Sequence, residues 1–301
     1  MSHPRLILSL DGGGARAQVV LQWLQLLEEH LGVPLAQVFD MVVGVSAGAI
    51  MAGMIAAGRQ LRTEVMDLNS VFADRDEKHN GLTGPKYVGG AKRRELERLF
   101  GKRRLRECQI PLGVLTCRLQ DGEARSFTSF RPEDNCFTVA SVVDASSAAP
   151  GYFPPVRVGS QYYMDGGVCT NNPTLVALAL ARQRWPAKPL AVLSLGVGPA
   201  ELVDMRTEKP ETFGLIRYFR TGLGSVITRV DEPFYRTVAE MVVGAGRYFR
   251  LTGSAPGELD GTSRADAQRY AREARRVWNA QVSGLKQQER VLQFIRRWTG
   301  R

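Results

Sequence analysis

The chain has 301 residues, of which 44% are hydrophobic and 23% charged, and its formal net charge is +10. These values are ordinary for a soluble globular protein of one large domain or two small ones, and the N-terminal apolar run is too short for a signal peptide. The four cysteines, Cys108, Cys117, Cys136 and Cys169, form no C-x-x-C pair and have no neighbouring histidine, which argues against a metal site and predicts reduced core thiols in a cytoplasmic protein.

Apolar runs predict buried strands at residues 5–10, 39–44, 110–117 and 189–196. Helical periodicity between them predicts helices at 19–31, 47–58, 91–100 and 173–183. Strands that alternate with helices indicate a three-layer α/β/α fold with a largely parallel central sheet. The final third reads as helical apart from one strand near 247–251. We therefore expect a single domain over 1–301, with a core at about 5–200 and a helical part at 201–301 that is integrated into it or appended to it.

A glycine-rich turn, D-G-G-G-A-R-A at 11–17, follows the first strand and leads into a helix. Consecutive glycines let backbone N–H groups converge, and a helix start adds positive potential, so the turn is suited to hold an anion. Its G-x-G-x-x-A spacing also fits a dinucleotide-binding turn. That reading requires an acidic residue at the end of the second strand, where this chain has a serine motif instead.

The serine motif is G-x-S-x-G at 44–48, in which Ser46 is a candidate nucleophile lifted from a strand-to-helix junction. The chain has only three histidines, His3, His30 and His79. Two precede the serine and the third lies in a polar stretch, so another base must accept its proton. Residues 41–58 are uncharged and could be a short membrane span or a strand followed by a buried helix; the small residues favour the second reading.

Two segments account for the net positive charge of the chain. Residues 92–106 hold eight basic and two acidic side chains, and residues 264–301 hold ten and three. Both have apolar residues at helical spacing, so each is either a solvated face on a core-packed helix or a surface for anionic membranes. Nucleic acid is the least favoured partner because few aromatic residues are interleaved. The polar, glycine-containing stretch 75–90 reads as a mobile loop and a candidate lid.

Further along, Asp165 begins D-G-G after a short strand, a pattern that is usually only a turn. Asn172 and Pro173 suit the N-cap and the first position of a helix. Between the serine motif and Asp165, the small residues and prolines of 145–155 predict a tight, apolar bend.

These four pieces, D-G-G-G-x-R at 11–16, G-x-S-x-G at 44–48, A-S-x-A-x-P-x-Y-F-P-P at 145–155 and D-G-G with N-N-P at 165–173, resemble the patatin-like phospholipase family. The resemblance implies a lipid acyl hydrolase with a Ser-Asp dyad and no histidine, which maps onto Ser46 and Asp165. It also implies an acyl-serine intermediate and an oxyanion hole, at Gly12, Gly13, Gly14 and Arg16. For Arg16, a salt bridge at the helix start is the alternative.

No metal-ligand set and no cofactor site is visible in the sequence, so the expected activity is independent of calcium. The expected substrates are membrane phospholipids, acted on by a cytoplasmic protein that associates peripherally with membranes. An anionic or cyclic-nucleotide activator fits the resemblance, and the oligomeric state is open. The alternatives are hydrolysis of another acyl ester, an inactive lipid- or nucleotide-binding regulatory module, and an oxidoreductase built on the glycine turn.

Overall fold

The computed structural model describes residues 4–64, 66–81, 83–198, 232–255 and 257–299. The described chain is built around an eight-stranded sheet in the order β5-β6-β3-β2-β1-β7-β8, with β4 also paired to β3. The parallel strands are β1 (Arg5–Leu10), β2 (Met41–Val45), β3 (Leu112–Arg118), β7 (Leu190–Gly196) and β8 (Tyr248–Thr252). The antiparallel strands are β4 (Ala124–Thr128), β5 (Val156–Val158) and β6 (Gln161–Asp165).

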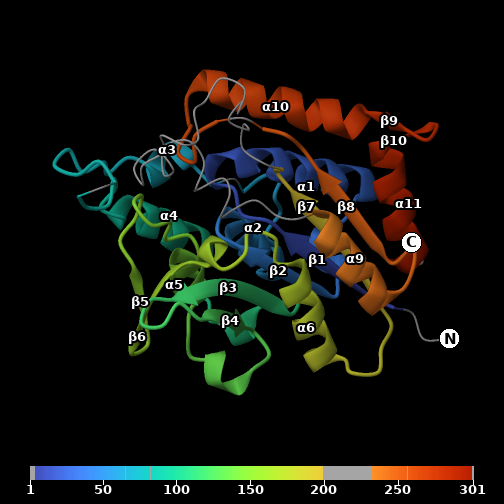
Figure 1. The fold of residues 1–301 in the computed structure, drawn as a ribbon, viewed down its shortest axis with the longest axis horizontal. Coiled ribbons are helices and arrows are strands. Elements are labelled where there is room, and N and C mark those ends of the chain that lie inside the picture. Colours follow the sequence, from blue (N-terminus) through green and yellow to red (C-terminus); the bar gives the residue numbers. More distant parts are fainter. Residues whose placement is uncertain (1–3, 65, 82, 199–231, 256, 300–301) are drawn as a thin grey trace, which may run out of the picture.

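Helices cover both faces of the sheet (Figure 1). One face packs against α6 (Thr174–Arg184) and α9 (Glu232–Val243). The other packs against α1 (Gln18–Leu31), α2 (Ala47–Ala56), α4 (Gly90–Phe100), α5 (Val139–Ser146), α10 (Arg264–Asn279) and α11 (Gln287–Thr299). Short elements complete the described chain: α3 (Leu68–Val71), the 3-10 turns η1 (Gly14–Ala17), η2 (Leu35–Gln37), η3 (Leu105–Glu107), η4 (Pro132–Asp134) and η5 (Gly166–Val168), and a hairpin of β9 (Gln281–Val282) and β10 (Leu285–Lys286).

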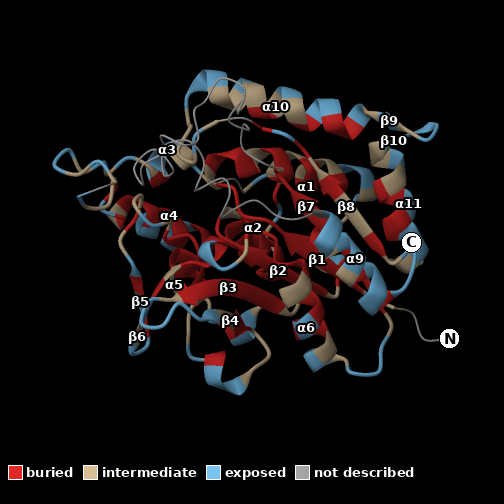
Figure 2. Cartoon of the chain, viewed as in Figure 1, coloured by how far each residue is buried: buried red, intermediate tan, exposed pale blue. Residues whose placement is uncertain are grey.

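The central strands are buried on both faces, as Figure 2 shows. Successive residues of a strand point to opposite faces. Leu6 and Leu8 therefore join the core on the α1 side, while Ile7 joins the core on the α6 side. This explains why these strands read as continuous apolar runs rather than as alternating patterns.

The predicted three-layer α/β/α fold is confirmed, and the long predicted elements lie within about two residues of their observed bounds. Strands β4 and β5, helix α5 and the hairpin β9–β10 were not predicted. Residues 41–58 form β2 followed by the buried helix α2, as the second reading required. Within the part of the chain that the structure describes, no helix is long and apolar enough to cross a membrane. The sequence also reads as a loop at 197–210, and most of that stretch lies outside the described residues.

Strands β2 and β6 pair with the same edge of β3, one after the other along its length. Strand β2 pairs with it up to Val45 opposite Leu115, and β6 pairs with it from Asp165 opposite Thr116. Strand β4 also pairs with β3 over Thr116, so it occupies the other edge. Since β2 runs parallel to β3 and β6 runs antiparallel, their carboxyl ends meet on this shared edge. The residue after Val45 therefore arrives beside Asp165.

The C-terminal elements share the sheet and its core. Strand β8 extends the sheet beyond β7, and α10 lies along α1, where the Trp23 indole Nε1 donates to the Ala274 carbonyl oxygen at 2.9 Å. Tyr270 and Trp278 of α10 belong to the same core cluster as the strands.

The segment 75–90 is irregular, as expected, but its described residues are held by specific contacts. Tyr87 is buried, pairs with Arg75 in an isolated bridge, and donates its backbone N–H to the Tyr152 carbonyl oxygen at 2.8 Å. The Tyr87 hydroxyl and the Lys86 ammonium both donate to the Asp260 carboxylate. These contacts join 75–90 to the segment that leads into α10.

Two sequence expectations need correction. All four cysteines are free, but Cys136 and Cys169 are exposed, so the prediction of core thiols is wrong for these two. Both lie in turns next to regular elements rather than within them. The basic segment 92–106 has a core-packed face, as one reading held, yet Lys92 and Glu95 are buried with it. Lys92 therefore belongs to neither a solvated face nor a membrane surface.

Candidate active site

Ser46 stands at the sharp junction between β2 and α2. Its backbone angles are φ 55° and ψ −128°, a region that costs non-glycine residues conformational energy. The turn is possible because Gly48 lacks a side chain: a Cβ there would lie 2.3 Å from the Leu10 carbonyl oxygen and 2.4 Å from that of Asp11. The motif thus presses the start of α2 against the end of β1 and lifts the Ser46 hydroxyl.

The Asp165 carboxylate meets this hydroxyl. Ser46 Oγ donates to Asp165 Oδ2 at 2.6 Å, and both residues are almost entirely shielded from solvent. The other carboxylate oxygen, Oδ1, accepts the Gly167 backbone N–H at 2.7 Å. Burial raises the pKa of Asp165 to about 6, although the bonds from Ser46 and Gly167 and the charge of Lys92 act in the opposite direction. The carboxyl group is therefore a stronger base than an exposed aspartate.

Ser146, the last residue of α5, supports the backbone of Ser46. The Ser46 backbone N–H donates to Ser146 Oγ at 2.9 Å, and that hydroxyl donates to the Leu115 carbonyl oxygen at 2.6 Å. Ser146 has no solvent exposure. Its hydroxyl thus joins the serine turn to β3.

The glycine turn lies beside Ser46. The Gly12 backbone N–H donates to the Asn171 carbonyl oxygen at 3.1 Å, so it is already occupied. Within the described residues, the N–H groups of Gly13 and Gly14 have no partner. Gly14 has φ 57°, and a Cβ there would lie 2.4 Å from the Leu259 carbonyl oxygen. The turn therefore presents two free donors, where the sequence predicted three.

Arg16 is 4% exposed, and its Nη1 donates to the Ala255 carbonyl oxygen at 3.5 Å. Its Nε is buried without a hydrogen-bond partner. Burial lowers the pKa of Arg16, and Tyr270 of α10 acts in the opposite direction. Its one hydrogen bond directs the guanidinium toward the segment before α10. The sequence left a salt bridge at the helix start as the alternative role of Arg16. Within the described residues, Arg16 forms no ion pair.

A buried ion pair anchors the start of the glycine turn. Arg250 of β8 donates to both carboxylate oxygens of Asp11, at 2.9 and 2.5 Å, and to Ser194 Oγ at 2.7 Å. The side chains of Arg250 and Asp11 are 4% and 2% exposed. This two-point contact ties the glycine turn after β1 to β8, the strand at the edge of the sheet.

The remaining sequence predictions at the site are partly confirmed. Helix α6 begins at Thr174, one residue later than expected, so Pro173 rather than Asn172 is its N-cap residue. The Asn172 side chain accepts the Thr174 N–H at 2.9 Å just before the helix. His30 contacts Leu26 and Trp278, and His79 contacts Asp76. Neither histidine is a hydrogen-bond partner of Ser46.

The sequence reasoning missed Ser146, Arg250 and Lys92. Ser146 lies in a recognised block but carries no signal for its bond to Ser46. Arg250 is a single arginine in a short strand, 239 positions from Asp11, and Lys92 lies within a run of basic residues. No local pattern marks either residue, because their roles depend on tertiary contacts.

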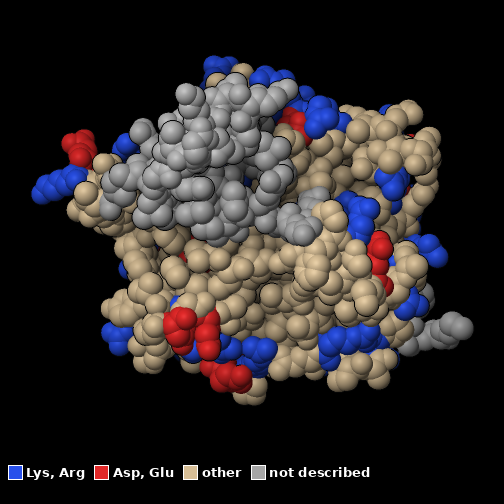
Figure 3. All heavy atoms as spheres, in the orientation of Figure 1, with Lys and Arg blue, Asp and Glu red and all other residues tan. Residues whose placement is uncertain are grey.

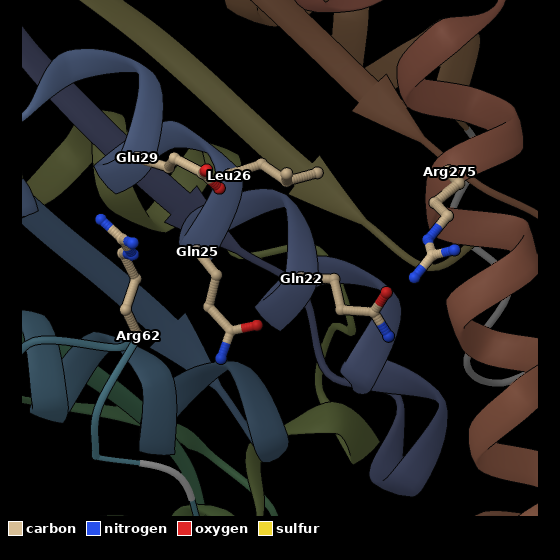
Figure 4. A pocket seen from close by; sticks show the side chains of 6 residues that line it. All are labelled: Gln22, Gln25, Leu26, Glu29, Arg62 and Arg275. Atoms are coloured by element: carbon tan, nitrogen blue, oxygen red, sulfur yellow. The ribbon is translucent and has the colours of Figure 1, made fainter.

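A separate hollow of about 310 Å³ lies between α1 and α10, lined by Gln22, Gln25, Leu26, Glu29, Arg62 and Arg275. Figure 4 shows Arg62 and Arg275 on opposite sides of the α1 side chains. Within the described residues, neither arginine forms an ion pair. No group of three or more His, Cys, Asp or Glu in the described part of the chain could hold a metal ion.

Comparison with known proteins gives consistent matches. A family model described as patatin-like phospholipase matches residues 8–178. The human calcium-independent phospholipase A2-gamma is 31% identical over 273 aligned residues, which cover 81% of this chain and 34% of that protein. An Escherichia coli cUMP-AMP-activated phospholipase is 28% identical over 64% of each chain. The chain thus spans about a third of the first curated relatives it matches.

Among solved structures, VipD from Legionella pneumophila aligns over 99% of this chain and 67% of that one, with 16% identity and a TM-score of 0.48.

Proposed function

The chain belongs to the patatin-like phospholipase family, and from that premise we propose that it is a lipid acyl hydrolase in which Ser46 and Asp165 form the catalytic dyad. The observation that carries this proposal is the buried hydrogen bond of 2.6 Å from Ser46 Oγ to Asp165 Oδ2. A nucleophile within hydrogen-bond reach of its base is the geometry that acyl transfer requires.

In the first half of the proposed reaction, Ser46 Oγ attacks the carbonyl carbon of an ester as Asp165 takes the hydroxyl proton. The negative oxygen that forms is received by the N–H groups of Gly13 and Gly14, which are free in the glycine turn. Loss of one such donor typically costs about 100- to 1000-fold in rate. Gly12 is left out because its N–H is engaged by Asn171, and Arg16 acts through its charge rather than through a hydrogen bond.

The tetrahedral intermediate then collapses. The bond to the leaving alcohol breaks, Asp165 returns its proton to the departing lysolipid oxygen, and the acyl group stays on Ser46. Asp165 next removes a proton from water, which attacks the acyl-serine and releases the fatty acid as Ser46 regains its proton. Each proton taken by Asp165 is given back, so the cycle needs no histidine.

A fluorophosphonate probe and a soluble ester test the dyad. We expect the probe to label the wild type covalently and to fail to label Ser46→Ala. We expect Asp165→Asn to lower ester hydrolysis at least 1000-fold while keeping the fold, since the amide cannot accept the proton. Near-normal turnover by Asp165→Asn would show that another group is the base. Absence of labelling together with tight dinucleotide binding would favour the oxidoreductase alternative.

The proposed substrates are glycerophospholipids of membranes, on which the protein acts from the surface. Figure 3 shows lysine and arginine spread around the rim of one face rather than gathered into a single patch. We therefore propose that the acyl chain, more than the headgroup charge, determines binding. Incubation with mixed vesicles, followed by mass spectrometry of the products, identifies the acyl position that is cut. Unchanged rates in excess EGTA would support calcium-independent action.

An anionic activator is a second part of the proposal. The relative from Escherichia coli is named for activation by cUMP-AMP, and the hollow between α1 and α10 has two arginines without ion pairs. Arginine binds phosphate through paired N–H donors. We expect a cyclic dinucleotide to bind in calorimetry and Arg275→Glu to weaken binding at least tenfold, with the exposed Arg104→Glu as a matched control. Equal binding by Arg275→Glu would exclude this hollow.

A further inference from the structure

Lys92, in the first turn of α4, is placed where a positive charge is costly. Its side chain is 3% exposed, and the N-terminus of a helix repels cations. Burial lowers the pKa of Lys92, and neighbouring Arg93 acts in the same direction, while Asp144 and Asp165 act against it. A buried lysine under these conditions is retained only where its partners compensate for the lost hydration.

Those partners lie at the C-terminal end of α5. Lys92 Nζ donates to the carbonyl oxygens of Asp144 and Ser147, each at 3.0 Å, and to Ser147 Oγ at 3.3 Å. Its ion pair with Asp144 Oδ1 is also 3.0 Å long, and it lies 4.4 Å from the centre of the Phe153 ring. The last carbonyls of a helix carry partial negative charge and lack partners within the helix. The ammonium therefore fastens the end of α5.

That same turn holds both members of the dyad. Ser146 accepts the Ser46 backbone N–H at 2.9 Å, and the Ala148 carbonyl oxygen accepts the Asp165 backbone N–H at 3.0 Å. Residues 144–148 thus contact Lys92 on one side and the backbones of Ser46 and Asp165 on the other. A shift of this turn would change the distance between the hydroxyl and the carboxylate.

We propose that Lys92 is a positioning residue of the dyad: its buried ammonium fastens the 144–148 turn and places a positive charge where it favours the ionised Asp165 carboxylate. This inference rests on the proposed function, because it assigns Lys92 a role toward the base of that mechanism. Lys92 lies outside every recognised motif, and a charge on the protein surface could not fill this role.

A test of this role must separate the effect of Lys92 on Asp165 from the effects of the other charged and polar groups around that carboxylate. Asp165 interacts with the Ser46 hydroxyl, the Gly167 N–H and Lys92, and its charge also acts on Cys169. Lys92 interacts with Asp144, Arg93 and Asp165. Among the described residues, Lys92 is the cation that acts on Asp165, so its removal should make the carboxylate harder to ionise.

The first experiment measures kcat/KM for a water-soluble ester between pH 5 and pH 8.5. Activity should rise with pH as Asp165 ionises. We expect Lys92→Met to move the midpoint upward by about one pH unit, since a nearby opposite charge typically shifts a carboxyl pKa by one to three units. For a wild-type midpoint of about 6, the ratio of the rate at pH 6 to the rate at pH 8 then falls about fivefold. Lys92→Arg keeps the charge and should keep the midpoint, even where its bulk lowers kcat.

Lys92→Met removes the 3.0 Å ion pair of the buried Asp144 and leaves that carboxylate the longer contact with Arg93 Nε, at 3.4 Å, so a second variant protects the test from misfolding. Lys92→Met/Asp144→Asn removes both charges of the pair and should fold while retaining the upward shift. Exposed Arg94→Met, on the same helix, is the matched control and should leave the profile unchanged. A purely structural role would lower kcat without moving the midpoint. A folded double variant with the wild-type midpoint would therefore overturn the proposal.

A readout that needs no turnover separates this inference from the proposed function. Carboxyl 13C NMR, with Asp165→Asn for assignment, follows the ionisation of Asp165 directly in wild type and in the double variant. An upward shift of about one unit supports the role of Lys92 even in a protein that hydrolyses no ester. If the enzyme is active and Asp165 is half ionised at the same pH in wild type and in the double variant, the proposed role of Lys92 is wrong. The Ser46–Asp165 dyad is then unaffected.

Discussion

At the scale of single residues, Asp165 combines its proposed catalytic role with a cost in stability. Burial raises its pKa to about 6 in the folded protein, from a reference value of 3.8. Between these two values the folded state holds a proton that the unfolded state releases, so the free energy of unfolding decreases as the pH rises through this window. Above about pH 6 the folded protein carries the full cost of an ionised buried carboxylate.

Asp165→Asn should therefore stabilise the protein in a pH-dependent way. The difference of about two pKa units corresponds to about 3 kcal/mol. We expect the free energy of unfolding of the variant, relative to wild type, to increase by up to about 3 kcal/mol between pH 4 and pH 7. Urea denaturation at the two pH values measures it. A difference that stays constant with pH would mean that Asp165 ionises in the folded state as easily as in the unfolded state.

Arg250 offers a second prediction at this scale. Arg250→Met leaves the Asp11 carboxylate buried without its two-point partner, and breaking a buried pair in this way costs about 3–5 kcal/mol. Arg250→Lys keeps the charge but loses the planar fork. We expect Arg250→Lys to fold and to lose up to about 100-fold in kcat, because the glycine turn after Asp11 is then poorly positioned.

Thermal unfolding and ester hydrolysis, measured together, check the role of Arg250. The double variant Arg250→Met/Asp11→Asn serves as the control, since it removes both charges of this pair and should recover stability without recovering the rate. Wild-type turnover by Arg250→Lys would mean that the geometry of the turn does not depend on this pair.

At the scale of elements, the sequence predicted those parts whose signal is local. Strands β1, β2, β3 and β7 are continuous apolar runs, and α1 shows a clear helical period, so each was found within about two residues. Strand β4 reads ARSFT and β5 only VRV. Both are short or partly exposed and acquire their pairing from β3 and β6, so no local pattern marks them.

The contacts of the segment 75–90 also have no local signal in the sequence, and they lead to a third prediction. Its polar composition predicted a mobile lid, whereas Lys86 and Tyr87 both donate to Asp260 in the segment before α10. Burial alone would raise the pKa of Asp260, but the hydrogen bonds from Lys86 and Tyr87 hold it below its usual value. The ionised carboxylate is thus the form that ties the two segments together.

We expect Asp260→Asn to release this tie. Because the neutral amide binds the ammonium more weakly, amide hydrogen exchange should become faster in residues 74–88 and 257–262 and stay unchanged in the central strands. The exposed Asp121→Asn, whose carboxylate pairs with Arg118 as that of Asp260 pairs with Lys86, should leave both segments as protected as in wild type. Equal protection in Asp260→Asn would show that the backbone contacts with 149–152 hold the segment alone.

At the scale of the whole molecule, the motifs and the structure that supports them occupy different parts of the chain. The family model and every recognised motif lie within residues 8–178. The sequence therefore identified Ser46 and Asp165, and the register on β3 explains why they meet. It could not identify the contacts that fix the glycine turn, since Arg250 and Leu259 come from the C-terminal third. Those contacts exist only once β8 and the segment before α10 are in place.

We therefore propose that the C-terminal part is integral to the fold rather than appended to it. The large apolar side chains that α10 and α11 bury in the shared core are Tyr270, Val277, Trp278, Val291, Leu292, Phe294 and Ile295. At about 1.5 kcal/mol for each, their burial contributes roughly 10 kcal/mol. That is comparable to the net stability of a typical domain, about 5–15 kcal/mol. Removing β8 also leaves the backbone groups along one edge of β7 unpaired. All seven residues of β7 are buried in the complete fold.

A chain shortened to residues 1–198 tests this integration. It retains every motif, so an appended C-terminal part would leave a soluble fragment that unfolds cooperatively and reacts with a fluorophosphonate. We expect the opposite: a fragment that binds a hydrophobic dye, shows no cooperative thermal transition and is not labelled at Ser46. Adding residues 232–301 as a separate chain should restore some labelling, because α10 and β8 then supply the Ala274 and Arg250 contacts to α1 and the glycine turn. The carboxyl edge of the sheet is thus complete only when both ends of the chain contribute to it.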